Sequence, residues 1–221
     1  MTESSPKTGK PSLAMILVPA LISLAVTLWR LTGELMTWSR SWFNPEAGGM
    51  NAIVGITWLA PVFGAYFALK LVRQGYPPPG RRKAVLLGLL GLGVLFVGAS
   101  FQATVLAREF RAGLIYIWLV GAAAAAIQYR AWPALFRVLL YYGLAARIPV
   151  VVIMFLAMWG GWGTHYDAVP AGFPSMGWFS GFLWLGLFPQ LIFWIGFTIV
   201  TGLLMGSIAV GLVSWRNPLP A

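Results

Sequence analysis

The sequence predicts an all-α membrane protein, a polytopic bundle of six transmembrane helices. Hydrophobic residues make up 59% of its 221 residues and charged residues only 9%, whereas soluble domains are typically about 25% charged. Six apolar stretches each contain roughly 18 or more residues, enough to cross a hydrocarbon core about 30 Å thick as a helix. Clusters of lysine and arginine follow alternate stretches, as in chains that cross a membrane repeatedly.

The chain begins with a polar, basic segment, residues 1–11, for which we expect a disordered cytoplasmic tail. The first span runs from about Ser12 to Leu35. It is too long for the apolar region of a cleaved signal peptide, and charged residues follow it instead of a small-residue cleavage site. We therefore interpret it as a signal anchor. The second span runs from about Met50 to Val72.

The next two spans are separated by short loops. Three consecutive prolines and two glycines after the second span prevent that helix from continuing. We expect the third span from about Ala84 to Leu106 and the fourth from about Ala112 to Tyr129. Between them lies a short charged turn.

The fifth span runs from about Pro133 to Met158, and proline is well suited to the first turn of a helix. A long loop rich in glycine and proline follows. The apolar segment from Trp178 to Trp215 is longer than one span needs. We expect an interfacial piece up to about Phe188 and the sixth span from Pro189. A re-entrant piece, or a single long tilted helix kinked at Pro189, is the alternative.

All the spans are expected to form one domain, residues 12–216, followed by a short C-terminal tail, residues 217–221. Small residues recur every four positions in the second span, at Ala60, Gly64 and Ala68, and in the sixth, at Gly202 and Gly206. Such spacing lets helix backbones approach closely. Packing within the chain is the first interpretation, and contact in a homo-oligomer is the second.

The positive-inside rule sets the orientation. The second loop and the N-terminal tail carry the basic cluster: Lys7, Lys10, Lys70, Arg73, Arg81, Arg82 and Lys83. We therefore expect a multi-pass protein of the cell membrane, an inner membrane, with both termini cytoplasmic. This membrane topology also explains the net charge of +10, so no nucleic-acid partner is predicted. Membrane lipids are the expected partners, and further membrane subunits or a second copy of the chain are open alternatives.

Acidic residues gather on the opposite, outer face. Every acidic residue beyond Glu3 belongs to it, as does the chain's one histidine: Glu34, Glu46, Glu109, His165 and Asp167. A basic inner face could leave acidic residues outside by default. The alternative is that the outer face carries a polar site.

Arg147 is the strongest site candidate because it lies well within the fifth span. An arginine there costs roughly 2.5 kcal/mol or more unless it is paired or hydrated, so it should face the bundle interior. Arg30 and Glu34 lie four residues apart and share one helical face. If Arg147 reaches the same carboxylate, the three form a buried polar network; binding of an anionic headgroup or carboxylate is the other role considered for Arg147.

Glu109, His165 and Asp167 are the outer-face candidates for acid, base or ligand roles, although the Thr-His-Tyr-Asp segment also fits a solvated loop. One histidine and no cysteine make a zinc site weak and exclude thiolate and iron–sulfur chemistry. No metal or cofactor is predicted. Signature motifs of P-loop ATPases, zinc proteases and serine hydrolases are absent from the sequence.

Three functions remain open. The favoured one is non-enzymatic: a small transporter, or an accessory subunit of a membrane complex, with an outward-facing polar pocket formed by Arg30, Glu34 and Arg147. The second is a membrane-embedded enzyme acting on a lipid or isoprenoid substrate at the outer interface. The third is a quinone- or lipid-binding subunit of an electron-transfer assembly.

Overall fold

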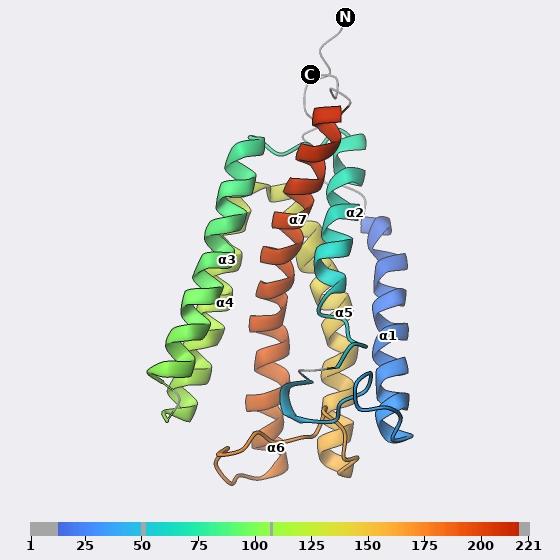
Figure 1. Ribbon diagram of the computed structural model, residues 1–221, viewed down its shortest axis with the longest axis vertical. Helices are drawn as coiled ribbons and strands as arrows, with labels where there is room; N and C mark the ends of the chain where they lie inside the picture. Colours follow the sequence, from blue (N-terminus) through green and yellow to red (C-terminus); the bar gives the residue numbers. More distant parts are fainter. Residues whose placement is uncertain (1–12, 50–51, 107, 217–221) are drawn as a thin grey trace, which may run out of the picture.

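The computed structural model describes residues 13–49, 52–106 and 108–216, and within these ranges all regular secondary structure is helical. The long helices run roughly side by side in one bundle (Figure 1). They are α1 (Leu17–Leu35), α2 (Leu59–Arg73), α3 (Arg81–Thr104), α4 (Phe110–Ala131), α5 (Pro133–Gly160) and α7 (Trp194–Arg216). The shorter elements are η1 (Leu13–Ile16), η2 (Ala47–Gly49), α6 (Trp178–Gly181), η3 (Phe182–Leu187) and η4 (Pro189–Phe193).

Five of the described helices are long and apolar enough to cross a membrane: Leu13–Leu35, Arg81–Thr104, Phe110–Ala131, Pro133–Gly160 and Trp178–Val213. The first, third, fourth and fifth expected spans therefore exist as helices, with ends within one turn of their predicted positions. The expected tails at 1–11 and 217–221 lie outside the described residues.

The second expected span differs from the prediction because its first part is not helical. Residues 52–58 form an irregular segment, and α2 begins only at Leu59 and contains 15 residues. Pro61 explains this start, since in a longer helix its ring would clash with the carbonyl of Thr57. The irregular segment instead folds into the end of the bundle, where it lines the cavity described below.

The last helix is continuous from Trp178 to Val213 and has 36 residues. It passes through Pro189 without a break, so the expected separate piece ending at Phe188 is wrong and the structure has the alternative, a single long helix. Two π-helical stretches meet here: η3 ends at Leu187, and η4 begins at Pro189 itself. Their wider turns accommodate a residue that cannot donate a backbone hydrogen bond.

The predicted small-residue faces meet each other within the chain. A Cβ on Gly64 would collide with the backbone of Gly202, and a Cβ on Gly206 would lie 2.8 Å from the carbonyl oxygen of Gly64. The backbones of α2 and α7 therefore touch, as the four-residue spacing predicts. This close approach places α7 beside α2 near the centre of the bundle (Figure 1).

The two ends of the bundle differ in charge. α1 begins and α7 ends at one end, where the loop from α2 to α3 also lies (Figure 1). The opposite end carries the loops 36–58 and 161–177 and the turn between α3 and α4. All acidic residues of the described ranges, Glu34, Glu46, Glu109 and Asp167, belong to this second end, which we call the acidic end.

Candidate functional site

A cavity of about 450 Å³ opens at the acidic end of the bundle, within the usual size range of small-molecule sites. Side chains from α1, α4, α5 and the long C-terminal helix line it, together with both large loops. Its polar lining includes Arg30, Arg147, His165, Tyr166 and Gln190. The rest is largely apolar, including Trp58, Leu114, Met154 and Leu185.

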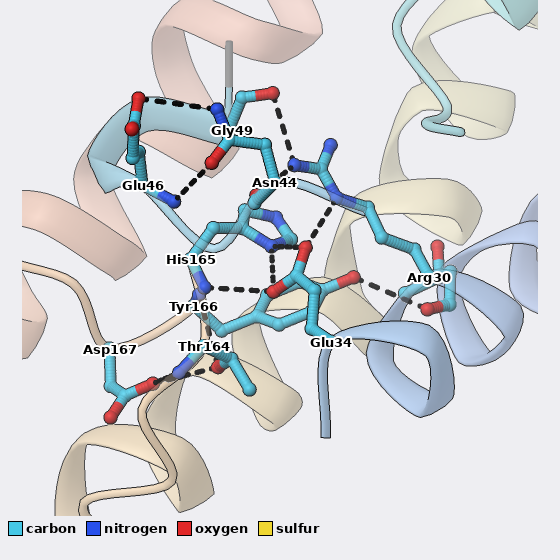
Figure 2. A network of polar contacts seen from close by, with 10 residues as sticks. Arg30, Glu34, Asn44, Glu46, Gly49, Thr164, His165, Tyr166 and Asp167 are labelled. Atoms are coloured by element: carbon cyan, nitrogen blue, oxygen red, sulfur yellow. Dashed lines mark hydrogen bonds and ion pairs between the residues drawn. The ribbon is translucent and has the colours of Figure 1, made fainter. Parts of the chain in front are cut away.

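Glu34 organises the outer part of this cavity. Its carboxylate has no exposed surface and pairs with Arg30, one helical turn earlier, at 2.8 Å between Nε and Oε1. The same carboxylate accepts a hydrogen bond from the His165 backbone N–H at 2.8 Å and contacts the imidazole Nδ1 at 2.6 Å. Figure 2 shows the carboxylate between the two side chains. Three residues from α1 and the 161–177 loop thus form one buried cluster.

The Arg30 guanidinium also fixes the 36–58 loop. Its Nη2 donates to the carbonyl oxygens of Asn44 and Gly49, at 3.2 and 3.1 Å. Gly49 has φ +64°, and a Cβ on it would lie 2.8 Å from Cδ2 of His165. Glycine therefore allows the positive φ and the close approach of this loop to the imidazole.

Asp167 shapes the segment that presents His165. Its carboxylate accepts hydrogen bonds from the backbone N–H groups of Gly163 and Thr164, at 2.8 and 2.7 Å, and from the Thr164 hydroxyl, at 2.7 Å. Thr164 is fully buried. The segment is consequently an ordered turn against α1, and the interpretation of Thr-His-Tyr-Asp as a solvated loop is wrong.

The environment of His165 determines its protonation. Burial lowers the pKa of the imidazole, and the Arg30 charge acts in the same direction, against the opposing effect of Glu34. The neutral ring therefore predominates near pH 7. Since an ionised carboxylate only accepts hydrogen bonds, Nδ1 carries the hydrogen and Nε2 keeps a free lone pair. No hydrogen bond within the described residues uses Nε2.

Tyr166 connects the same turn to α1. Its hydroxyl donates to the backbone carbonyl of Thr27 at 3.3 Å, and its ring stacks on His165 with centroids 3.8 Å apart. Burial raises the pKa of the Tyr166 hydroxyl well above its ordinary value. The phenol therefore stays neutral and acts as a packing and hydrogen-bonding group.

Arg147 forms the inner part of the cavity. It lies about 21 Å along α5 from Pro133 at 1.5 Å per residue, and only 5% of its surface is exposed. Its Nη1 donates to Oε1 of Gln190 at 3.1 Å, and its guanidinium lies 4.8 Å from the ring centroid of Trp194. Within the described residues no carboxylate pairs with Arg147. It thus presents a positive charge and unused N–H donors to the cavity.

The structure brings together Arg30, Glu34, Arg147 and His165 of the predicted site residues, all in or directly behind one cavity. The expected contact between Arg147 and Glu34 is replaced by Arg147 with Gln190 and by Glu34 with His165. Asp167 acts as a turn residue. Glu109 is exposed beside the start of α4 and does not line the cavity.

Sequence reasoning missed several cavity residues. One of them is Gln190, and the available signal was a polar residue directly after Pro189 in an apolar segment. The three-residue spacing of Thr164 and Asp167 resembles a side-chain-capped turn and could have indicated an ordered loop. Trp194 carries no signal among so many tryptophans.

Comparison with known proteins does not indicate a family for this chain. No protein-family model, curated protein or solved structure matches it. Any function must therefore be argued from the cavity itself. Within the described residues, no three His, Asp or Glu side chains are grouped closely enough to hold a metal ion.

Proposed function

We propose that this protein is a multi-pass membrane protein that binds a small anionic molecule in the cavity at its acidic end, as a small transporter or as an accessory subunit of a membrane complex. Large apolar side chains exposed on the outer helices support a lipid environment, among them Leu21, Leu89, Phe96, Val97 and Leu119. Exposed apolar surface on this scale is unfavourable in water and expected in a bilayer.

The proposed orientation has the acidic end outside and both termini in the cytoplasm. It is supported by the basic residues at the other end, Lys70, Arg73, Arg81, Arg82 and Lys83. The chain has no cysteine, so single cysteines can be labelled selectively. Ser175→Cys should react with an impermeant maleimide in intact cells, and Gln74→Cys only after permeabilisation; the reverse pattern would invert the orientation.

Arg147 is the observation that carries the binding proposal. A buried arginine without a carboxylate partner is costly within a helix bundle, and an anion in the adjoining cavity would compensate its charge. Arg30 is already compensated by Glu34, so the cavity has an excess of one positive charge. A quinone would accept hydrogen bonds but leave that charge unpaired, which favours an anion over the electron-transfer alternative.

Native mass spectrometry of gently extracted protein tests this proposal. The wild type should retain a discrete small molecule or lipid, and Arg147→Gln should lose it. Arg137→Gln is the matched control, because Arg137 lies on the same helix but is exposed, and it should retain the ligand. Equal retention by both variants would contradict a binding role for Arg147. A stoichiometric protein partner would favour the accessory-subunit role over transport.

The contact between Glu34 and His165 favours a second candidate, an enzyme acting on a lipid or isoprenoid substrate at the outer interface. A carboxylate bonded to Nδ1 orients the imidazole and leaves Nε2 available as a general base. For an enzyme, His165→Asn should abolish turnover of the retained ligand without abolishing its binding. Unchanged turnover in this variant would exclude His165 as the base.

A further inference from the structure

Within the described residues no hydrogen bond uses the lone pair on His165 Nε2, and this lone pair distinguishes the cavity from a simple anion site. We propose that the cavity takes its ligand as a phosphate monoester together with one proton, and that Nε2 of His165 accepts that proton. The inference rests on the proposed anion-binding function. It adds the chemical class of the ligand and a proton to that function.

The geometry around the imidazole fixes which nitrogen is available. Nδ1 is held by both carboxylate oxygens of Glu34, at 2.6 and 2.8 Å, and the His165 backbone N–H is held by the same carboxylate. The ring therefore has a set orientation, and rotation would break these contacts. His165, Arg30 and Gly49 all line the cavity, and the Nε2 edge of the ring lies against Gly49: a Cβ on Gly49 would be 3.3 Å from Nε2 and 3.2 Å from the Arg30 Nη2.

The donors and acceptors of the cavity define a complementary ligand. Arg147 and Arg30 offer N–H donors, and Nε2 offers an acceptor. An ionised carboxylate, a sulfate ester or a phosphodiester satisfies the arginines but has no hydrogen for Nε2. A singly protonated phosphate monoester satisfies all three, because it has acceptor oxygens and one P–OH donor.

Charge balance leads to the same class of ligand. The described charged or titratable side chains that line the cavity or lie beside His165 come from α1, α5, its own turn and the 36–58 loop: Arg30, Glu34, Arg147, Tyr166, Asp167 and Glu46. Arg30 and Glu34 cancel, Tyr166 is neutral, and Asp167 and Glu46 bond outside the cavity lining. One net positive charge remains, on Arg147.

A monoanion therefore neutralises the cavity. Phosphate monoesters have a second pKa of about 6 and are mostly dianions above pH 7. Binding at that pH takes up one proton from bulk water, which is then shared between a phosphate oxygen and Nε2. The resulting imidazolium would lie between two anions, Glu34 and the phosphate, which stabilises it.

The phosphate could belong to a lipid or to a soluble molecule. Apolar residues beside the polar part of the cavity, including Leu114, Met154 and Leu185, suit the first carbons of a lipid chain. The experiment therefore uses two arms. Dioleoyl phosphatidic acid presents the phosphate monoester on a lipid, and inorganic phosphate presents it free.

Isothermal titration calorimetry of the full-length protein in mild detergent at pH 7.5 measures both binding and proton uptake. Phosphatidic acid should bind at least tenfold more tightly than dioleoyl phosphatidylmethanol, a phosphodiester with the same chains and no headgroup hydroxyl. Repeating the titration in buffers of different ionisation enthalpy should give close to one proton taken up. If inorganic phosphate alone reproduces the proton uptake and phosphatidic acid does not bind, the ligand is soluble.

His165→Asn is the discriminating variant, because asparagine can still donate to Glu34 but has no counterpart of Nε2. It should bind both lipids with equal affinity and without proton uptake. Spectroscopy of the unaltered protein covers the case in which this variant does not fold. The chain has a single histidine, so its two ¹⁵N resonances can be assigned directly; they should indicate the Nδ1–H tautomer without ligand and imidazolium with phosphatidic acid.

The failures of the two proposals are distinguishable. Equal, Arg147-dependent binding of both lipids, with no proton taken up and a ring that stays neutral, would overturn this inference and leave the anion site intact. Absence of binding by either lipid and by inorganic phosphate would overturn this inference. It would also overturn the proposed function if native mass spectrometry finds no ligand dependent on Arg147.

Discussion

Replacing Glu34 with alanine should destabilise the protein far more than replacing Glu46, although both are acidic residues at the same end of the bundle. Glu34 has no exposed side-chain surface and bonds to the Arg30 guanidinium and to two groups of His165. Its loss leaves a buried guanidinium unpaired and a backbone N–H without an acceptor. Removing one partner of such a buried pair typically costs about 3–5 kcal/mol.

Glu46 provides the matched comparison. Its side chain is exposed and accepts a hydrogen bond of 3.2 Å from the Asn44 side chain, so its removal should cost less than about 1 kcal/mol. The two variants should then differ by at least about 2 kcal/mol in free energy of unfolding. For a chain of this length, each kcal/mol shifts the melting temperature by roughly 2–4 °C, which predicts a gap of at least about 4 °C.

Tryptophan fluorescence in one detergent can measure both melting temperatures, because the chain contains 12 tryptophans. Glu34→Gln separates the contribution of the hydrogen bonds from that of the charge. Glutamine keeps an acceptor oxygen but leaves the Arg30 charge uncompensated, so the melting temperature of this variant should lie between those of the wild type and Glu34→Ala. Equal melting temperatures for Glu34→Ala and Glu46→Ala would refute the claim that the cluster of Arg30, Glu34 and His165 holds the loops on the bundle.

Two further predictions concern pH and packing. Because the pKa of His165 in the folded protein lies below its usual 6.5, the unfolded chain binds more protons below that pH, so stability should fall as pH drops from 6.5 through the folded pKa. Melting curves across this range should show a smaller loss for His165→Asn, and identical pH profiles would argue against the assigned protonation. Gly64→Ala should lower the melting temperature sharply, because a Cβ there collides with the backbone of Gly202. In the control Gly93→Ala the new Cβ meets nothing within 4 Å, so this variant should be neutral or slightly stabilising. Similar melting temperatures for the two variants would mean that α2 and α7 do not touch.

The irregular segment 52–58 shows where local patterns fail. The segment is as rich in apolar residues as a membrane-spanning helix. Hydropathy alone therefore extends the second span back to about Met50. Pro61 and the glycines before it are local features that disfavour a helix in this segment. The path that the segment takes instead, along the wall of the cavity, depends on the tertiary structure. Similarly, Pro189 in the sequence indicates a break or a kink, whereas in the structure the helix continues through wider π-helical turns and packs against α4 and α5 there.

Sequence alone determined the features that depend on residues close together in the chain. Hydropathy over about 20 residues predicts helices, four-residue spacing predicts both the Arg30 to Glu34 pair and the close contact of α2 with α7, and loop charge separates the two ends. The site itself depends on tertiary structure. Glu34 and His165 are 131 residues apart in the chain, and Arg147 and Gln190 are 43 apart. Only the packed bundle and its two ordered loops bring these groups together, because the partner of a side chain on another helix depends on how the helices are rotated and not on its neighbours in sequence.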